Sequence, residues 1–131
     1  MPLRLLLAIA CLASAAIAAD GDALDREIRA STLIQAGDTA PDFSCKTTDG
    51  HAFTLSAQKG KVVLLYFFAS SVPFCYPEMR YIEKEIVAKL SKREDFTVLC
   101  VGRGHHREEL VKIGGENKLR LPMAADEQKE I

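Results

Sequence analysis

The chain has 131 residues, enough for one domain with a modest hydrophobic core and too few for two. Its charges almost cancel, with 17 Lys and Arg against 18 Asp and Glu, and they are scattered along the sequence. This pattern argues against a nucleic-acid-binding groove and against a basic membrane-binding patch, so no nucleic-acid partner is expected.

The first 19 residues have the features of an export signal. Arg4 supplies a positive charge, an apolar run follows over residues 5–17, and residues 16–18 fit an A-x-A cleavage site. We expect the mature chain to begin at Ala19 or Asp20. The apolar run is shorter than the ~20 residues of a spanning helix, so no stable membrane span is expected after cleavage. The sequence therefore predicts a periplasmic or secreted protein.

The cysteines give a second indication of how the domain is built. Cleavage would remove Cys11, which lies too early in the apolar run to be a lipid anchor, and would leave Cys45, Cys75 and Cys100. An odd number of cysteines in an oxidising compartment leaves at least one thiol free or paired outside the chain. This argues against a small domain stapled by disulfides.

The next predicted elements lie before the core of the domain. Residues 20–36 carry apolar side chains at loosely helical spacing, so they form either a short helix or a linker. Residues 43–47 and 52–55 have strand composition, and Asp49-Gly50 between them supplies the positive φ of a tight turn. We expect an N-terminal β-hairpin here.

The core begins with an apolar strand followed by an amphipathic helix. Residues 61–68, KVVLLYFF, are apolar, β-branched and aromatic, which is typical of a strand buried on both faces. Beyond a break at residues 69–73, one apolar stripe recurs every three or four residues, at Met79, Ile82, Ile86 and Leu90.

The rest of the chain continues the alternation of strands and helices. Residues 96–101 form a second buried strand, residues 108–112 open a helix that Gly114-Gly115 ends or weakens, and residues 119–124 form a third strand. This order predicts an α/β fold with a mostly parallel sheet and helices on both faces. Ligands of such sheets gather beyond the carboxyl ends of the strands, which directs attention to residues 70–75.

Cys75 is the candidate reactive residue of that segment. It falls in the first turn of the predicted helix, where unpaired N–H groups and the helix dipole favour a thiolate. We expect Ser70 or Ser71 to cap the helix and Pro73 to lie in its opening turn. The alternative is a buried, inert cysteine, which is our interpretation of the two cysteines within predicted strands, Cys45 and Cys100.

Several segments resemble the opening of TlpA/ResA-type thiol-disulfide oxidoreductases and of AhpC/TSA peroxiredoxins. They are GDTAPDF at residues 37–43, DG at 49–50, LS at 55–56 and KGKVVLLYFFAS at 59–70. The resemblance covers residues 37–131 and implies a thioredoxin-like fold. It also implies a C-terminally truncated domain, because the last strands and helix of these families do not follow. Residues 62–68 would then be an open, aggregation-prone sheet edge, and we expect the chain to be insoluble, partly folded or oligomeric and inactive as an oxidoreductase.

The resemblance is most specific around Cys75. TlpA-type proteins typically have W-C-x-P-C-x-x-E-M, and residues 71–79 are SVPFCYPEM in the same frame. The second cysteine is kept as Cys75, together with Glu78, while Val72 stands where the first cysteine would be. In these families the first cysteine is the nucleophile and the second resolves the mixed disulfide. Cys75 therefore cannot form a disulfide within its own motif.

The peroxiredoxin signature P-x-x-x-T-x-x-C also places a cysteine at Cys75. Its proline position holds Phe68 and its threonine position holds Val72, so the motif is intermediate. The resemblance implies Cys75 as the catalytic residue, a thiol or disulfide of a protein partner or a peroxide as substrate, and no cofactor. The alternatives are a non-catalytic thioredoxin-like binding module, with its groove near Val72 and Pro73, and an inactive truncated product.

Three further features carry less weight. Glu78 would accept a proton if buried, but a solvated glutamate stabilised by the helix dipole is the favoured interpretation. The adjacent His105 and His106 point in different directions and have no spaced ligands, so no metal site is expected. The turn at residues 102–104 lacks the Lys-Ser/Thr ending of a phosphate loop.

Overall fold

The computed structural model describes residues 23, 26–27, 29–30 and 34–131. The expected signal peptide, residues 1–19, lies outside these residues. The chain divides into two units, Met1–Pro41 and Asp42–Ile131. In the first unit, residues 23, 26–27 and 29–30 are helical, and the Gln35 side chain donates a hydrogen bond to the Arg29 carbonyl at 3.0 Å. No helix of the described part of the chain is long and apolar enough to cross a membrane.

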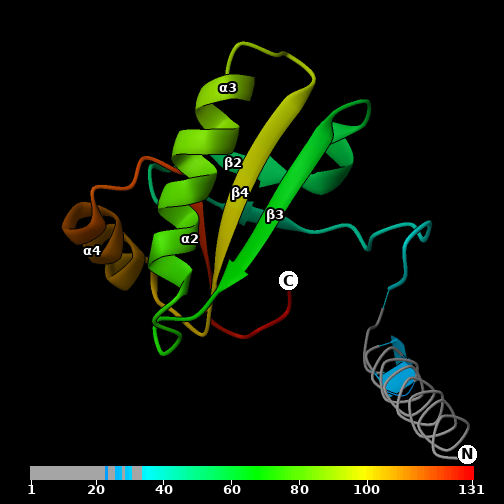
Figure 1. Ribbon diagram of the computed structural model, residues 1–131, viewed down its shortest axis with the longest axis horizontal. Helices are drawn as coiled ribbons and strands as arrows, with labels where there is room; N and C mark the ends of the chain where they lie inside the picture. Colours follow the sequence, from blue (N-terminus) through cyan, green and yellow to red (C-terminus); the bar gives the residue numbers. More distant parts are fainter. Residues whose placement is uncertain (1–22, 24–25, 28, 31–33) are drawn as a thin grey trace, which may run out of the picture. The chain divides into compact units, whose positions relative to one another are not determined.

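The second unit contains a three-stranded parallel sheet with the order β3-β4-β5 (Figure 1). Its strands are β3 (Val62–Phe68), β4 (Phe96–Arg103) and β5 (Met123–Asp126). The pairing of β3 with β4 ends at Phe68↔Gly102, and that of β4 with β5 ends at Arg103↔Asp126. All three carboxyl ends therefore meet at one edge of the sheet. The predicted α/β class with a mostly parallel sheet is confirmed.

The predicted hairpin is also present. β1 (Ser44–Lys46) pairs antiparallel with β2 (Ala52–Thr54). Gly50 has a φ of 90°, and its N–H donates a hydrogen bond to the Thr47 carbonyl at 2.9 Å, which closes the turn. The Thr48 N–H donates to the Met123 carbonyl at 2.7 Å, so the hairpin is tied to the parallel sheet.

The long helices pack on one face of the parallel sheet. A helical run over residues 75–90 follows β3. It comprises α2 (Cys75–Tyr81), the π-helical η2 (Ile82–Val87) and α3 (Ala88–Leu90). The next helix, α4 (Arg107–Asn117), follows β4. These helices share a buried cluster with Val98 and Cys100 of β4. The predicted apolar stripe is confirmed at its centre, since Met79 is 0% exposed and Ile82 5%.

The other face of the sheet is covered by the hairpin and by the 3₁₀ helix η1 (Leu55–Gln58). Leu99 and Val101 of β4 point to this face and pack in a cluster with Phe53. Successive side chains of β4 thus pack into two different layers, one on each face of the sheet. The sequence predicted helices on both faces, and among the described residues the second face carries one short 3₁₀ helix beside the hairpin.

Gly114-Gly115 were predicted to end or weaken α4, and they do not end it. The helix runs through Gly114, where a Cβ would lie 2.7 Å from the Cε of Met123. The glycine therefore allows close packing on β5, which outweighs its helix penalty of about 1 kcal/mol. The helix ends at Lys118, with a φ of 54°, and the Leu119 N–H donates to the Gly114 carbonyl at 2.9 Å.

The third strand begins later than predicted, at Met123 instead of residue 119. The Leu119 N–H is used in ending α4, and Pro122 has no N–H to donate to a strand ladder. Leu119 and Leu121 are nevertheless buried, 8% and 4% exposed. They are apolar because they lie in the core, in a segment that belongs to no helix or strand.

β3 is less buried than its composition predicts. Val62 is 65% exposed and Phe67 43%, so the expectation of burial on both faces is wrong. The reason is that β3 lies at an edge of the sheet, since within the described residues it pairs only with β4. An apolar, β-prone edge offers unpaired N–H and C=O groups to a strand of another chain.

We expect Phe67→Lys to weaken self-association through this edge. A lysine there keeps its charge in water and opposes strand pairing between copies, which should raise the dissociation constant about tenfold, or about 1.4 kcal/mol. Light scattering over a range of concentrations measures the effect. Val111→Lys is the matched control, because Val111 is 51% exposed on α4, away from the sheet edge. Equal self-association of both variants would show that copies do not meet through β3.

Candidate functional site

Cys75 is the first residue of α2 and lies beyond the carboxyl end of β3. Two successive turns lead to it from the strand. The Val72 N–H donates a hydrogen bond to the Ala69 carbonyl at 3.1 Å, and the Cys75 N–H donates to the Val72 carbonyl at 3.2 Å. We refer to residues 69–75 as the cysteine loop. Its turns bring the thiol to the start of the helical run.

The helix start differs from the prediction in its caps. Phe74 precedes the first helical residue and provides no side-chain cap, so neither Ser70 nor Ser71 caps the helix. Pro73 lies in the cysteine loop, outside the helix, because the two turns there delay its start. Pro77 instead occupies the first helical turn, where an N–H would have no partner in the helix.

The Cys75 side chain belongs to the buried cluster on the helical face of the sheet. It is 8% exposed and shares this cluster with Phe68 and Met79. The flanking residues are very different, since Val72 is 44% exposed and Phe74 80%. A small area of the thiol residue therefore reaches the surface between two exposed apolar side chains.

Tyr66 and Glu78 form a hydrogen-bonded pair close to Cys75. The Tyr66 hydroxyl donates to Oε2 of Glu78 at 2.7 Å. Burial, the bond to Glu78 and the nearby Cys75 raise the pKa of Tyr66 above its ordinary value, so the phenol keeps its proton. Glu78 itself is exposed, which agrees with the interpretation of a solvated glutamate rather than a buried proton acceptor.

The structure also places His105 at this site. From the sequence, this residue is considered only as a metal ligand. The Ser70 N–H donates to Nε2 of His105 at 3.0 Å. The imidazole also stacks on Phe68, with 5.8 Å between ring centroids. The available signal was topological: Gly102 pairs with Phe68, so residues just after Gly102 meet the cysteine loop at the carboxyl edge of the sheet.

His105 and His106 have different partners. Nδ1 of His105 lies 3.3 Å from Oε2 of Glu109, whereas Nδ1 of His106 lies 3.1 Å from Oε2 of Glu127. The bond to Glu127 raises the pKa of His106. Over the residues with described positions, no three His, Cys, Asp or Glu side chains form a group that could hold a metal ion.

The other two described cysteines lie within strands and are free thiols. Cys100 of β4 is 0% exposed, and burial raises its pKa to about 12. Burial also raises the pKa of Cys45 in β1. Both thiols therefore stay protonated near neutral pH, as expected for cysteines that fill space.

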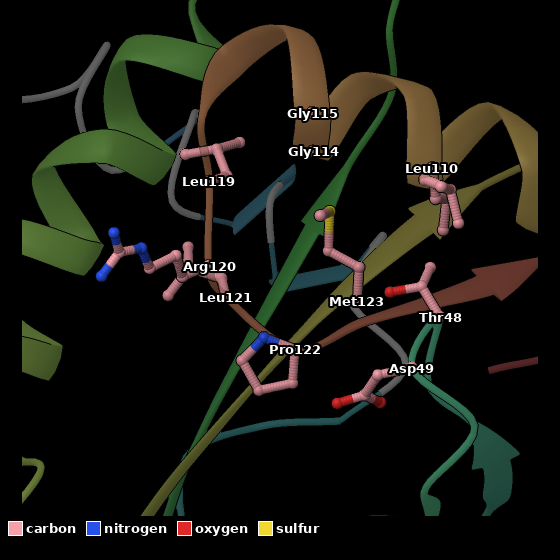
Figure 2. A pocket seen from close by; sticks show the side chains of 11 residues that line it. Thr48, Asp49, Leu110, Gly114, Gly115, Leu119, Arg120, Leu121, Pro122 and Met123 are labelled. Carbon is pink, nitrogen blue, oxygen red and sulfur yellow. The ribbon is translucent and has the colours of Figure 1, made fainter.

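A separate cavity of about 350 Å³ lies between α4, the hairpin turn and the start of β5 (Figure 2). Its lining is apolar from α4 and β5, with Asp49 and Arg120 as its charged residues. No residue of the cysteine loop lines it. It is therefore a different feature from the site around Cys75.

Comparison with known proteins gives a family and two groups of relatives. The model of the Redoxin family matches residues 35–131. The thiol-disulfide oxidoreductase ResA of Geobacillus kaustophilus is 29% identical over 100 residues, which cover 76% of this chain and 56% of ResA. The thioredoxin-like protein YneN of Bacillus subtilis is 44% identical over 61 residues, which cover 44% of this chain and 36% of YneN. The chain thus spans about half the length, or less, of the curated relatives it matches.

Solved structures give the same picture. A Bacteroides thetaiotaomicron protein, described as a candidate protein disulfide isomerase, matches with a TM-score of 0.68 and 35% identity over 72% of this chain and 59% of its own. The thioredoxin domain of a thiol-disulfide oxidoreductase from Bacteroides vulgatus matches with a TM-score of 0.59 and 26% identity, over 72% of this chain and 65% of its own. The names of these proteins all refer to thioredoxin or to thiol-disulfide chemistry.

Proposed function

The chain belongs to the Redoxin family, with a thioredoxin-like fold of TlpA/ResA type, and from this we propose that it is a thiol-disulfide oxidoreductase whose reactive thiol is Cys75. The proposed substrate is a thiol or disulfide of a partner protein. We also propose that residues 1–19 direct export to the periplasm or the medium, and that residues 37–131 form the thioredoxin-like domain.

The observation that carries the proposal is the place of Cys75 in the fold. It begins a helical run of residues 75–90 at the carboxyl edge of a parallel sheet. Ligands of parallel sheets gather at this edge, so a partner disulfide can approach the thiol there. Cys45 and Cys100 have no such position, and burial raises the pKa of both.

The proposed reaction is thiol-disulfide exchange through an intermolecular intermediate. The Cys75 thiolate attacks one sulfur of a partner disulfide; a new S–S bond forms, the old one breaks, and the other partner sulfur leaves as a thiolate that takes up a proton. Val72 offers no second thiol. An outside thiol therefore attacks the mixed disulfide, releases Cys75 and becomes part of a new disulfide, so that the electrons come from that outside thiol.

A non-catalytic binding module is the second candidate. Its support is the exposure of Val72 and Phe74, 44% and 80%, which presents apolar side chains to a partner peptide beside a thiol that is itself 8% exposed. Peroxide is a less favoured substrate than a disulfide. Val72 carries no hydroxyl to orient a peroxide at the position where the peroxiredoxin signature has threonine.

The order in which the cysteines react tests the proposal. We expect a limiting amount of an aromatic disulfide to modify Cys75 first in the folded protein, with Cys45 slower by roughly tenfold or more. Cys100, which is 0% exposed, should react only after denaturation. Mass spectrometry of the digested protein identifies the modified residue. First modification at Cys45, or no reaction before denaturation, would contradict the oxidoreductase and favour the binding module.

A further inference from the structure

His105 makes a partly buried contact with the backbone of the cysteine loop. Its side chain is 8% exposed, and its Nε2 accepts a hydrogen bond from the Ser70 N–H at 3.0 Å. Phe68 holds the ring in place by stacking. Ser70 itself is exposed, so the bond holds the loop with the modest free energy of one partly solvated hydrogen bond. The contact therefore fixes where Ser70 lies.

Glu109 sets the tautomer that this contact needs. Since Nε2 accepts a hydrogen bond, the neutral ring carries its hydrogen on Nδ1, which lies 3.3 Å from Oε2 of Glu109. The same carboxylate accepts the His106 N–H at 2.9 Å. The bonds from His106 and His105 lower the pKa of Glu109, so it stays an acceptor. The neutral Nδ1–H tautomer of His105 is thus held from α4.

The cysteine loop connects Ser70 to Cys75 through backbone hydrogen bonds. Ala69, next to Ser70, accepts from Val72, and Val72 accepts from Cys75. A shift of the Ser70 amide therefore displaces the turn that ends at the thiol residue. The position of Cys75 depends on an anchor that comes from the end of a different strand.

We propose that His105 is a positioning residue for Cys75 that holds the cysteine loop only while its Nε2 is unprotonated. The inference rests on the proposed role of Cys75 as the reactive thiol. When Nε2 of His105 carries a proton it is a donor, and it faces the Ser70 N–H, which is also a donor, at 3.0 Å. The hydrogen bond with Ser70 is then lost. The loop then moves, and the reactivity of Cys75 falls.

Other charged groups surround this end of the sheet. Within the part of the chain that the structure describes, Glu109 is the charged side chain paired directly with the His105 ring. Charged side chains at this end of the sheet also include Arg103 at the end of β4, His106, Arg107 and Glu108 at the start of α4, Asp126 and Glu127 at the end of β5, Lys129, whose Cε lies near Gly104, and Glu78 in α2. His106 is the one that shares the chemistry of His105, and it therefore serves as the control.

The test compares rates of Cys75 alkylation by iodoacetamide, from about pH 5 to about pH 9, in the wild type and in His105→Gln. A glutamine oxygen can accept the Ser70 N–H near the position of Nε2 but does not titrate. The ionisation of Cys75 is common to both proteins, so it cancels in the ratio of their rates. We expect a ratio near one when His105 is neutral and a fall of about 2- to 10-fold as it takes up a proton, the effect of one hydrogen bond.

Two further variants complete the design. His105→Leu removes the acceptor and should react about 2- to 10-fold more slowly than the wild type at high pH. His106→Gln, at the exposed neighbour, should reproduce the wild-type profile. Nuclear magnetic resonance should show the Ser70 amide titrating together with the His105 ring.

A wild-type to His105→Gln ratio that stays constant through the titration of the ring overturns the proposal, even if His105→Leu does not fold. So does a folded His105→Leu protein that reacts as fast as the wild type. Iodoacetamide needs no partner protein. If disulfide exchange is absent but the ratio of wild-type to His105→Gln alkylation rates still falls as His105 takes up a proton, the proposed function is wrong and the positioning role stands.

Discussion

Cys75→Ser is expected to abolish disulfide exchange, with the rate of mixed-disulfide formation lowered at least on the order of 100-fold. The thiolate is the attacking group in exchange, and a serine hydroxyl does not form a comparable nucleophile near neutral pH. The remaining described thiols cannot replace it, because burial raises the pKa of both Cys45 and Cys100. The measurement is the appearance of a mixed disulfide with a disulfide-bonded peptide, followed by chromatography and mass spectrometry.

Cys45→Ser is the matched control for this loss. It makes the same chemical change at a partly buried thiol in β1, away from the helix start. We expect its exchange rate to stay within about twofold of the wild type. A Cys75→Ser protein that still forms the mixed disulfide would assign the reaction to a different cysteine, and an equal loss in both variants would point to damage of the fold.

The sheet could be predicted because its signals are local. The apolar runs that become β3 and β4 are long enough to define strands, and the helical stripe at Met79 and Ile82 between them requires a crossover that makes the strands parallel. The hairpin follows from Asp49-Gly50 in the same way. The place of Cys75 at the carboxyl edge is a direct consequence of this order.

The features that sequence analysis missed depend on contacts between distant segments. The passage of α4 through Gly114 is favoured by Met123 of β5, which is nine residues further along the chain. The bond between Ser70 and His105 joins residues 35 positions apart, and no local pattern predicts it.

The surroundings of Cys75 are more elaborate than an inert cysteine needs. A phenol bound to a carboxylate lies on one side, at Tyr66 and Glu78, and the loop before the thiol is anchored at Ser70. Neither support involves the Val72 side chain. The lack of a thiol at Val72 therefore removes one chemical step, the internal resolution of the mixed disulfide, and leaves the setting of Cys75 in place.

Val72→Cys is expected to convert the single-thiol site into a dithiol site. The Cys75 N–H donates to the Val72 carbonyl at 3.2 Å, so these residues are the first and fourth of a hydrogen-bonded turn. The Cα atoms of such a turn lie within about 7 Å of each other, close to the range of about 4.4–6.8 Å that a disulfide bridges. Val72 is also 44% exposed, so the introduced thiol can reach a substrate.

The expected result is reduction of insulin by dithiothreitol that the wild type catalyses at most weakly and the variant accelerates on the order of 100-fold or more. The gain arises because attack by a neighbouring thiol resolves the mixed disulfide far faster than attack by a thiol from solution. Phe74→Cys is the matched control: Phe74 is 80% exposed and adds an accessible thiol, but at a spacing that does not match the turn. If both variants gained activity equally, any extra surface thiol would suffice. If Val72→Cys and the wild type were equally active, Val72 would not occupy the nucleophile position, or an outside thiol would already release Cys75 as fast as an internal thiol does.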